Sequence, residues 1–253
     1  MSLFDLRGRT ALVTGATQGL GLAIARTLAD QGARLVVTDR DPLACEQGAA
    51  SLPSATAIAA DMAVPADIAA LVERAGPLDI LVCNAGIQGP AGPLAHASDA
   101  DWQQVFDINL RAAARLCALV LPGMAARGGG SAVLISSIAG LRGNQSIGLY
   151  GLTKAALSQL ARNLAVEWGP SGVRVNAVSP GLIRTPLAER LMADDAFMAR
   201  RSGVAWTRRR ARGCGWRGRH AGQPRRGFCD WTQPGGRWRH HHQRWELKPC
   251  TAC

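Results

Sequence analysis

The sequence predicts an α/β fold in which helices cover both faces of a doubly wound, parallel sheet. Short apolar runs alternate with helical patterns, and strands are expected at residues 10–14, 34–38, 55–60, 78–83, 131–136 and 173–178. Because these runs are apolar throughout, both faces of each strand should be buried, as in parallel sheets. Right-handed crossovers between such strands give a Rossmann-like arrangement.

The helices between these strands carry apolar stripes that should face the sheet. One long helix is expected from about residue 99 to residue 125. The helix that contains Tyr150 has a core-facing stripe at helical spacing, formed by Leu157, Leu160, Leu164 and Trp168.

Length and composition limit the kind of protein. At 253 residues and 47% hydrophobic content, the chain suits one α/β domain with a sizeable core. No apolar run is long enough to cross a bilayer, and residues 1–8 are charged and lack the apolar stretch of a signal peptide. A cytoplasmic location without membrane contact is therefore expected.

The net charge of +11 lies almost entirely in the last fifth of the chain. Residues 203–253 hold eleven Arg and one Lys against Asp230 and Glu246, which leaves residues 1–202 near neutral. No apolar periodicity continues beyond about Ser202. We therefore expect a folded domain at residues 1–202 and an irregular Arg-, Trp- and Gly-rich tail at residues 203–253.

A glycine-rich turn, residues 14–21, follows the first strand and opens a helix. Gly15, Gly19 and Gly21 permit a tight turn and let a pyrophosphate approach the backbone, while the helix N-terminus supplies amide donors. A turn without a ligand is the alternative, but the strand–turn–helix context favours a dinucleotide site.

Polar or small residues stand at successive strand ends. Asp39 could accept both ribose hydroxyls of an adenosine and repel a 2′-phosphate, which favours NAD over NADP. Arg40 could instead pair with that phosphate, and Asp39 could be a simple strand-end cap. Asp61 could bind the adenine amine, and the asparagine of Asn84-Ala85-Gly86 could brace the sheet ends.

The only tyrosine, Tyr150, lies four residues before Lys154, so the two side chains should share one helix face. A nearby ammonium lowers the pKa of a phenol, which suits proton exchange near neutral pH. Ser137 could hold a substrate oxygen. Asn109 lies inside the long helix, where it could bend the helix, hold a water or simply face solvent.

Residues 5 to about 200 resemble the single-domain short-chain dehydrogenase/reductase (SDR) family. The motifs that carry the resemblance are residues 15–21, Asn84-Ala85-Gly86, Asn109, Ser137, Tyr150, Lys154 and Pro180-Gly181. The resemblance implies that Tyr150 is the general acid/base and that Lys154 binds the nicotinamide ribose and lowers the Tyr150 pKa. It also implies that Ser137 orients the substrate and that Asn109 holds a water in a proton relay.

Residues 1–202 are therefore expected to form a dinucleotide-binding catalytic domain that needs no metal. The expected cofactor-binding residues are Gly15, Thr17, Gln18, Gly19, Leu20, Gly21, Asp39, Arg40, Asp61, Met62, Asn84, Ala85, Gly86, Tyr150, Lys154, Pro180, Gly181, Ile183 and Thr185. The family usually has a second asparagine where this chain has Cys83, whose side chain is expected to point into the sheet.

The resemblance implies an NAD-dependent oxidoreductase that interconverts a secondary alcohol and a ketone, in a homotetramer. The small-molecule substrate is expected to contact residues 88–94, 141–149 and 187–200, with Gln88, Asn144 and Gln145 as hydroxyl partners. An NAD-binding remnant without catalysis is one alternative. Nonspecific nucleic-acid or anion binding through the basic tail is another, and no specific nucleic acid is expected.

The tail departs from the family, which normally ends in a further helix and strand. Reading the codons of residues 228–245 shifted by one nucleotide permits a family-like last strand, because Trp231, Trp238 and Trp245 then each force a glycine. We hypothesise that the tail is a frameshifted product, so its His-Cys cluster (residues 240–253) would bind metal only by chance. Loss of the strand predicts an unprotected sheet edge at residues 173–178, poor solubility, little activity and weakened tetramer contacts.

Overall fold

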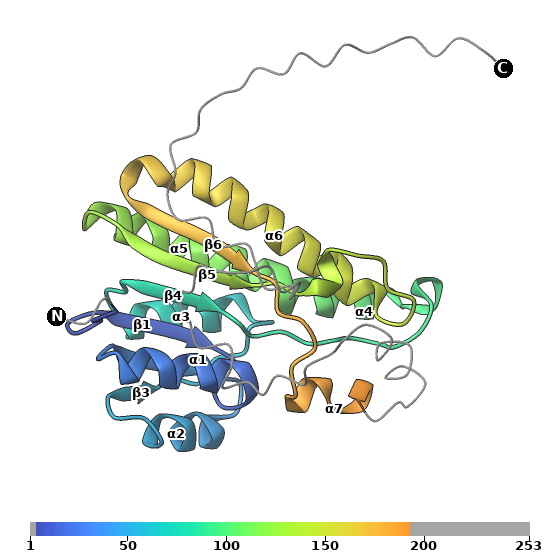
Figure 1. Ribbon diagram of the computed structural model, residues 1–253, viewed down its shortest axis with the longest axis horizontal. Coiled ribbons are helices and arrows are strands. Elements are labelled where there is room, and N and C mark those ends of the chain that lie inside the picture. Colours follow the sequence, from blue (N-terminus) through green and yellow to red (C-terminus); the bar gives the residue numbers. More distant parts are fainter. Residues whose placement is uncertain (1–3, 193–253) are drawn as a thin grey trace, which may run out of the picture.

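The computed structural model describes residues 4–192, which form an α/β fold around one parallel sheet (Figure 1). The six strands are β1 (Thr10–Thr14), β2 (Arg34–Thr38), β3 (Ala55–Ala57), β4 (Ile80–Cys83), β5 (Gly130–Ile135) and β6 (Val173–Val178). Their order is β3-β2-β1-β4-β5-β6, and every neighbouring pair is parallel. The predicted doubly wound, Rossmann-like sheet is confirmed.

Helices cover the sheet on both faces, and each face has its own core. The helices are α1 (Gly19–Asp30), α2 (Pro42–Ala50), α3 (Pro65–Ala75), α4 (Asp99–Phe106), α5 (Ala112–Ala126), α6 (Gly148–Trp168) and α7 (Pro186–Met192). Side chains of α3, α5 and α6 share one core with alternate strand residues such as Leu12 and Leu81, while those of α1 and α2 share the other with Val13 and Val37. This alternation follows from the period of two along each strand.

The α6 stripe lies where the sequence predicts it. Leu157 is buried, and Leu160, Leu164 and Trp168 pack against the same core. Cys83 is also buried, as expected for a side chain that points into the sheet.

The long helix expected from residue 99 to residue 125 is not continuous. A capping box of Ser98 and Asp101 starts α4, a π-helical turn occupies Asp107–Arg111, and α5 then continues to Ala126. The π-helical turn inserts extra backbone into the i→i−4 ladder, and such turns are frequent at functional sites. Asn109 lies within it.

The predicted strand bounds need small corrections. β3 ends at Ala57, although the amides of Ile58 and Ala60 still donate to carbonyls of β2 and the residue after it. β4 starts at Ile80, although the Asp79 backbone still bonds to Thr10 and Ser131, and its carboxylate accepts from Arg9 and the Thr10 amide.

Within residues 4–192, β6 forms one edge of the sheet, and no helix is long and apolar enough to span a bilayer. The expectations for the tail, including its irregular structure and the missing last strand, fall on residues outside the described range, as do residues 193–200 of the expected substrate region.

Candidate functional site

The site is built where the carboxyl ends of β1, β4 and β5 meet at one edge of the sheet. The Thr14 hydroxyl at the end of β1 accepts hydrogen bonds from the amides of Asn84 and Ala85, both at 3.0 Å. The Asn84 side chain donates in return to the carbonyls of Thr14 and Gly15, at 2.9 and 3.0 Å. Asn84 therefore braces the sheet ends as the sequence predicts.

The glycine turn forms a narrow cradle in front of α1. Gly15 and Gly19 adopt left-handed backbone angles, with φ of +62° and +55°. A Cβ on Gly21 would lie 2.0 Å from the Gly15 carbonyl oxygen and 2.5 Å from Nδ2 of Asn84. The α1 N-terminus has neither a side-chain cap nor an acidic residue in its first turn, so this cradle fits the pyrophosphate of a dinucleotide.

The β2 end presents a carboxylate whose orientation is fixed. Thr17 of the glycine turn donates to Oδ2 of Asp39 at 2.6 Å, and the Arg40 amide donates to Oδ1 at 2.8 Å. The Cys45 thiol accepts from the Asp39 amide at 3.0 Å. The carboxylate therefore lies against the turn that would hold the pyrophosphate, whereas the Arg40 side chain is exposed.

The neighbouring β3 end holds Asp61 and Met62. Asp61 accepts from the Ala63 amide at 2.8 Å, and its own amide donates to Asp67 at 3.0 Å. Met62 is buried beneath this turn. The Asp61 carboxylate remains half-buried at the same edge as Asp39.

The loop after β6 returns to the glycine turn. Its Pro180 carbonyl accepts from the Ile138 amide at 3.0 Å, which ties the loop to the end of β5. A Cβ on Gly19 would lie 3.4 Å from Thr185, so this loop and the glycine turn are in contact. Ile183 is buried between them and the sheet edge, whereas Pro180 and Gly181 are half-buried.

Asn109 does not face solvent, which rules out one of the sequence interpretations. It is 1% exposed, its Oδ1 accepts from the Ile87 amide at 2.8 Å, and its Nδ2 donates to the Ile87 carbonyl at 2.8 Å and to the Thr153 hydroxyl at 3.1 Å. Both N–H donors of the amide are therefore used. The second lone pair of Oδ1 and the backbone carbonyl are the groups left for a relay water.

Tyr150 and Ser137 are brought together at the end of β5. The half-buried phenol interacts with the Ser137 side chain, although the two residues come from α6 and from the segment after β5. Burial raises the pKa of Tyr150, and the interaction with Ser137 partly opposes that rise. The expectation that the ammonium of Lys154 lowers this pKa is therefore not met in the structure.

The position of Lys154 explains that difference. Its Nζ lies 5.5 Å from the centroid of the Tyr150 ring and donates to the Ile135 carbonyl at 2.7 Å. The ammonium thus sits over the ring face, where it makes a cation–π contact. Burial lowers the pKa of Lys154 itself to about 8, which reduces the positive charge available to stabilise a phenolate.

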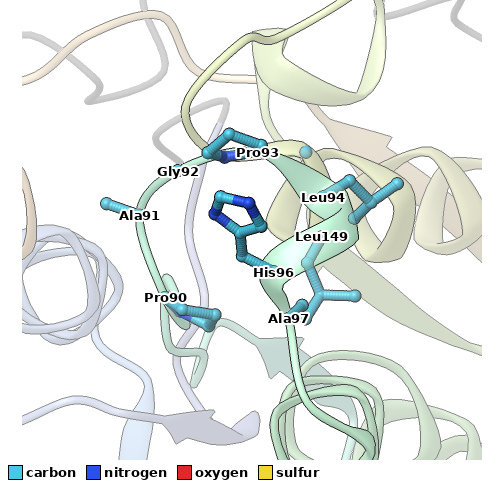
Figure 2. A pocket seen from close by; sticks show the side chains of 9 residues that line it. Pro90, Ala91, Gly92, Pro93, Leu94, His96, Ala97 and Leu149 are labelled. Atoms are coloured by element: carbon cyan, nitrogen blue, oxygen red, sulfur yellow. The ribbon is translucent and has the colours of Figure 1, made fainter.

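The expected substrate segments meet near the start of α6. The Gly92 amide donates to the Ser146 carbonyl at 2.9 Å. A small hollow of about 40 Å³ lies next to this link, and Figure 2 shows the His96 ring inside the curve of the loop from Pro90 to Pro93. Its lining comprises Pro90, Ala91, Gly92, Pro93, Leu94, His96, Ala97, Gly148 and Leu149.

The three expected partners of a substrate hydroxyl differ in their exposure and in the hydrogen bonds that they already make. The Asn144 amide donates to the carbonyls of Ala139 and Arg142 at 2.7 and 2.9 Å, so both of its donors serve the loop itself. Gln145 is exposed and Gln88 is half-buried. Asn144 therefore has its Oδ1 left to accept from a substrate hydroxyl, and all three partners stay predictions.

Sequence reasoning missed several buried hydroxyls that support the site: Thr14, Ser136, Thr153 and Ser158. Ser and Thr are common throughout folded chains, and no spacing rule marks those that will be buried.

Known proteins resemble this chain over most of the described region. The family model "short chain dehydrogenase" matches residues 9–196. Oxidoreductase UcpA of Escherichia coli (strain K12) is 43% identical over 196 residues, which cover 73% of each chain. Dehydrogenase/reductase SDR family member 4 of Bos taurus is 40% identical over 199 residues, covering 76% of this chain and 71% of its own length.

Solved structures agree with that relationship. A short chain dehydrogenase/reductase family protein superimposes with a TM-score of 0.73 at 44% identity, covering 76% of this chain and 82% of its own. A 3-ketoacyl-(acyl-carrier-protein) reductase from Brucella melitensis complexed with NADH has a TM-score of 0.71 at 30% identity, covering 73% and 80%. With its matched fold and sequence, the chain belongs to the short-chain dehydrogenase/reductase family of NAD(P)-binding oxidoreductases that act on CH–OH groups.

Proposed function

We propose that the protein is an NAD-dependent oxidoreductase that interconverts a secondary alcohol and a ketone, with Tyr150 as general acid/base. The observation that carries the proposal is the interaction of the Tyr150 phenol with the Ser137 side chain, with Lys154 over the tyrosine ring. The pair lies at the carboxyl edge that also bears the glycine cradle. An oxygen bound between the two hydroxyls would be oriented by Ser137 and protonated or deprotonated by Tyr150.

The cradle residues and Asp39 would hold the pyrophosphate and the adenosine ribose, and Lys154 the nicotinamide ribose. When bound, the nicotinamide would accept hydride from the alcohol carbon or return it to the ketone. In the oxidising direction Tyr150 takes the hydroxyl proton as a phenolate. In the reducing direction the neutral phenol gives its proton to the carbonyl oxygen, so the raised pKa of Tyr150 favours the donor form in the cofactor-free protein.

The preference for NAD over NADP is supported by the carboxylate of Asp39. Thr17 and the Arg40 amide orient it, and a fixed carboxylate both accepts ribose hydroxyls and repels a 2′-phosphate. Asp41 and Glu46 lie near it in sequence and add negative charge, while Arg40 next to it is an exposed cation.

A homo-oligomer is also proposed, since apolar side chains on α5 and α6 remain exposed. Leu119, Leu152 and Val166 are 47%, 43% and 78% exposed. Light scattering after gel filtration tests this: a monomer at micromolar concentration would overturn it.

A cofactor-reduction screen across alcohols, with NAD and NADP in parallel, tests the reaction. For an alcohol that the protein oxidises, kcat should fall by about 10³-fold or more in Tyr150→Phe, since general acid–base catalysis contributes about 10²–10⁴-fold. The affinity for NAD should change little. Retained turnover in Tyr150→Phe would refute the assignment. NAD binding without turnover of any alcohol would instead indicate a noncatalytic NAD-binding protein.

A further inference from the structure

Three consecutive residues at the end of β5 each bind a different group of α6, which lies beside β5 and β6 (Figure 1). The Ile135 carbonyl accepts from Nζ of Lys154, the Ser136 hydroxyl donates to the backbone carbonyl of Lys154 at 2.5 Å, and the Ser137 side chain interacts with the Tyr150 phenol. Lys154 is thus held at both its side chain and its backbone. No sequence motif marks Ser136, the middle residue of this set.

A second serine extends the contact. Ser158, one turn after Lys154 on α6, donates to the Ser136 hydroxyl at 2.9 Å and lies 3.2 Å from the Lys154 carbonyl. Ser136, Lys154 and Ser158 are 2%, 3% and 8% exposed. The Ser136 amide also donates to the Val178 carbonyl of β6 at 2.8 Å. Ser136 therefore bonds to α6 through its hydroxyl and to β6 through its backbone.

These bonds lie one residue from Ser137 and one helical turn from Tyr150. A helical carbonyl already accepts from the amide four residues later, so the Lys154 carbonyl does not need Ser136 for its own satisfaction. What the Ser136 hydroxyl adds is a cross-link between the strand end and the helix. Its removal would leave α6 free to shift relative to Ser137.

We propose that Ser136, supported by Ser158, is a positioning residue that sets the distance between the Ser137 hydroxyl on the strand side and the Tyr150–Lys154 pair on α6. The proposal rests on the proposed function, because it concerns the same reaction. Ser136 touches neither substrate nor cofactor in it and acts through Tyr150 and Lys154. A displacement of about 1 Å at a reacting group can cost about 100-fold in rate, so a modest shift would be measurable.

The test uses the fact that Tyr150 is the only tyrosine in the chain. Carbon-13 labelling at the tyrosine Cζ therefore gives a single resonance whose titration reports the Tyr150 phenol alone, without any turnover. In Ser136→Ala, a weakened interaction with Ser137 should raise the pKa of Tyr150 further, because that interaction lowers it. With an alcohol substrate, kcat should fall about tenfold, its pH profile for oxidation should move upward, and KM for NAD should stay within about twofold.

Two further variants complete the experiment: Ser158→Ala tests the supporting serine, and Ser51→Ala is a control. Ser158→Ala keeps the Ser136–Lys154 bond, so it should shift the titration in the same direction by less, and it tests the proposal if Ser136→Ala fails to fold. Ser51→Ala is the matched control, since its hydroxyl also donates to a helix carbonyl, that of Gly48 at 2.7 Å, on distant α2. It should leave the titration and the profile unchanged.

Two outcomes separate this proposal from the proposed function. If Ser136→Ala and Ser158→Ala lower the Tm but leave the Tyr150 titration unchanged, the two serines have only a structural role. That result overturns the proposal. A shifted titration in a protein that turns over no alcohol supports the positioning contact while the proposed reaction fails.

Discussion

The side-chain amide of Asn109 donates to the hydroxyl of Thr153, and that hydroxyl donates to the backbone carbonyl of Tyr150 at 2.8 Å. Asn109 also bonds twice to Ile87, in the loop after β4. The π-helical turn between α4 and α5 is thereby joined to the substrate-side loop and to the helix that carries the tyrosine. A residue expected to face solvent or bend a helix thus connects three segments.

Replacing Asn109 by Ala should destabilise the protein by about 2–4 kcal/mol, because both backbone groups of Ile87 lose their partner in a buried site. Thr153→Val should cost less, about 1–2 kcal/mol, since the Ile87 bonds remain. Urea unfolding at constant m-value measures both. Thr153→Ser keeps the hydroxyl, and stability losses equal to those of Thr153→Val would contradict the hydrogen-bond explanation.

Gly21→Ala should destabilise the fold and abolish cofactor binding. The added Cβ would meet the Gly15 carbonyl and Asn84, so the glycine cradle must open, at a cost of about 2–4 kcal/mol. Gly143→Ala is the control, because nothing lies within 4 Å of its added Cβ, its φ is outside the left-handed region and it does not precede a proline. It should change stability by less than about 0.5 kcal/mol. Quenching of tryptophan fluorescence by NADH measures binding in both variants.

Asp39→Ser should shift the ratio of kcat/KM for NAD to that for NADP toward NADP by about 10- to 100-fold, since a 2′-phosphate would no longer face a carboxylate. Asp41→Asn removes the same charge two residues away and keeps an N-cap for α2. Its ratio should change by no more than about twofold if contact decides the preference. Equal shifts in the two variants would show that net charge decides it instead.

Lys154 should make stability depend on pH in a defined window. Its pKa falls from 10.5 in the unfolded chain to about 8 in the folded protein. The unfavourable free energy of burying the Lys154 charge is therefore fully present below about pH 8. As pH rises from 8 toward 10.5 the unfolded state binds more protons, so this penalty is relieved and stability increases.

The comparison with Lys154→Met isolates that effect. Burial raises the pKa of Cys45 and of Tyr150, and both groups lower stability at higher pH in either protein. Urea unfolding at about pH 7.5 and about pH 10 should show the advantage of the Met variant shrinking by about 2–3 kcal/mol. A constant difference between the two proteins would mean that Lys154 keeps an ordinary pKa.

The regular elements were predictable because they depend on local pattern. Apolar runs of the right length located every described strand, and Val173–Val178 coincides with its predicted bounds. The break at Asp107–Arg111 was not predictable, since the sequence there continues a helical pattern and only burial of the Asn109 amide against Ile87 and Thr153 favours the π-helical turn.

By itself the sequence determined the parallel α/β sheet, the glycine cradle before α1, and the order in which Ser137, Tyr150 and Lys154 occur. Periodicity and motif spacing depend only on the order of residues, so both can be read from the sequence. Only the tertiary structure decided the state of these groups. Burial raises the Tyr150 pKa, Lys154 Nζ lies over the Tyr150 ring, and Ser136 donates to a carbonyl of α6. Desolvation and hydrogen bonding between distant segments depend on packing, which local sequence does not encode.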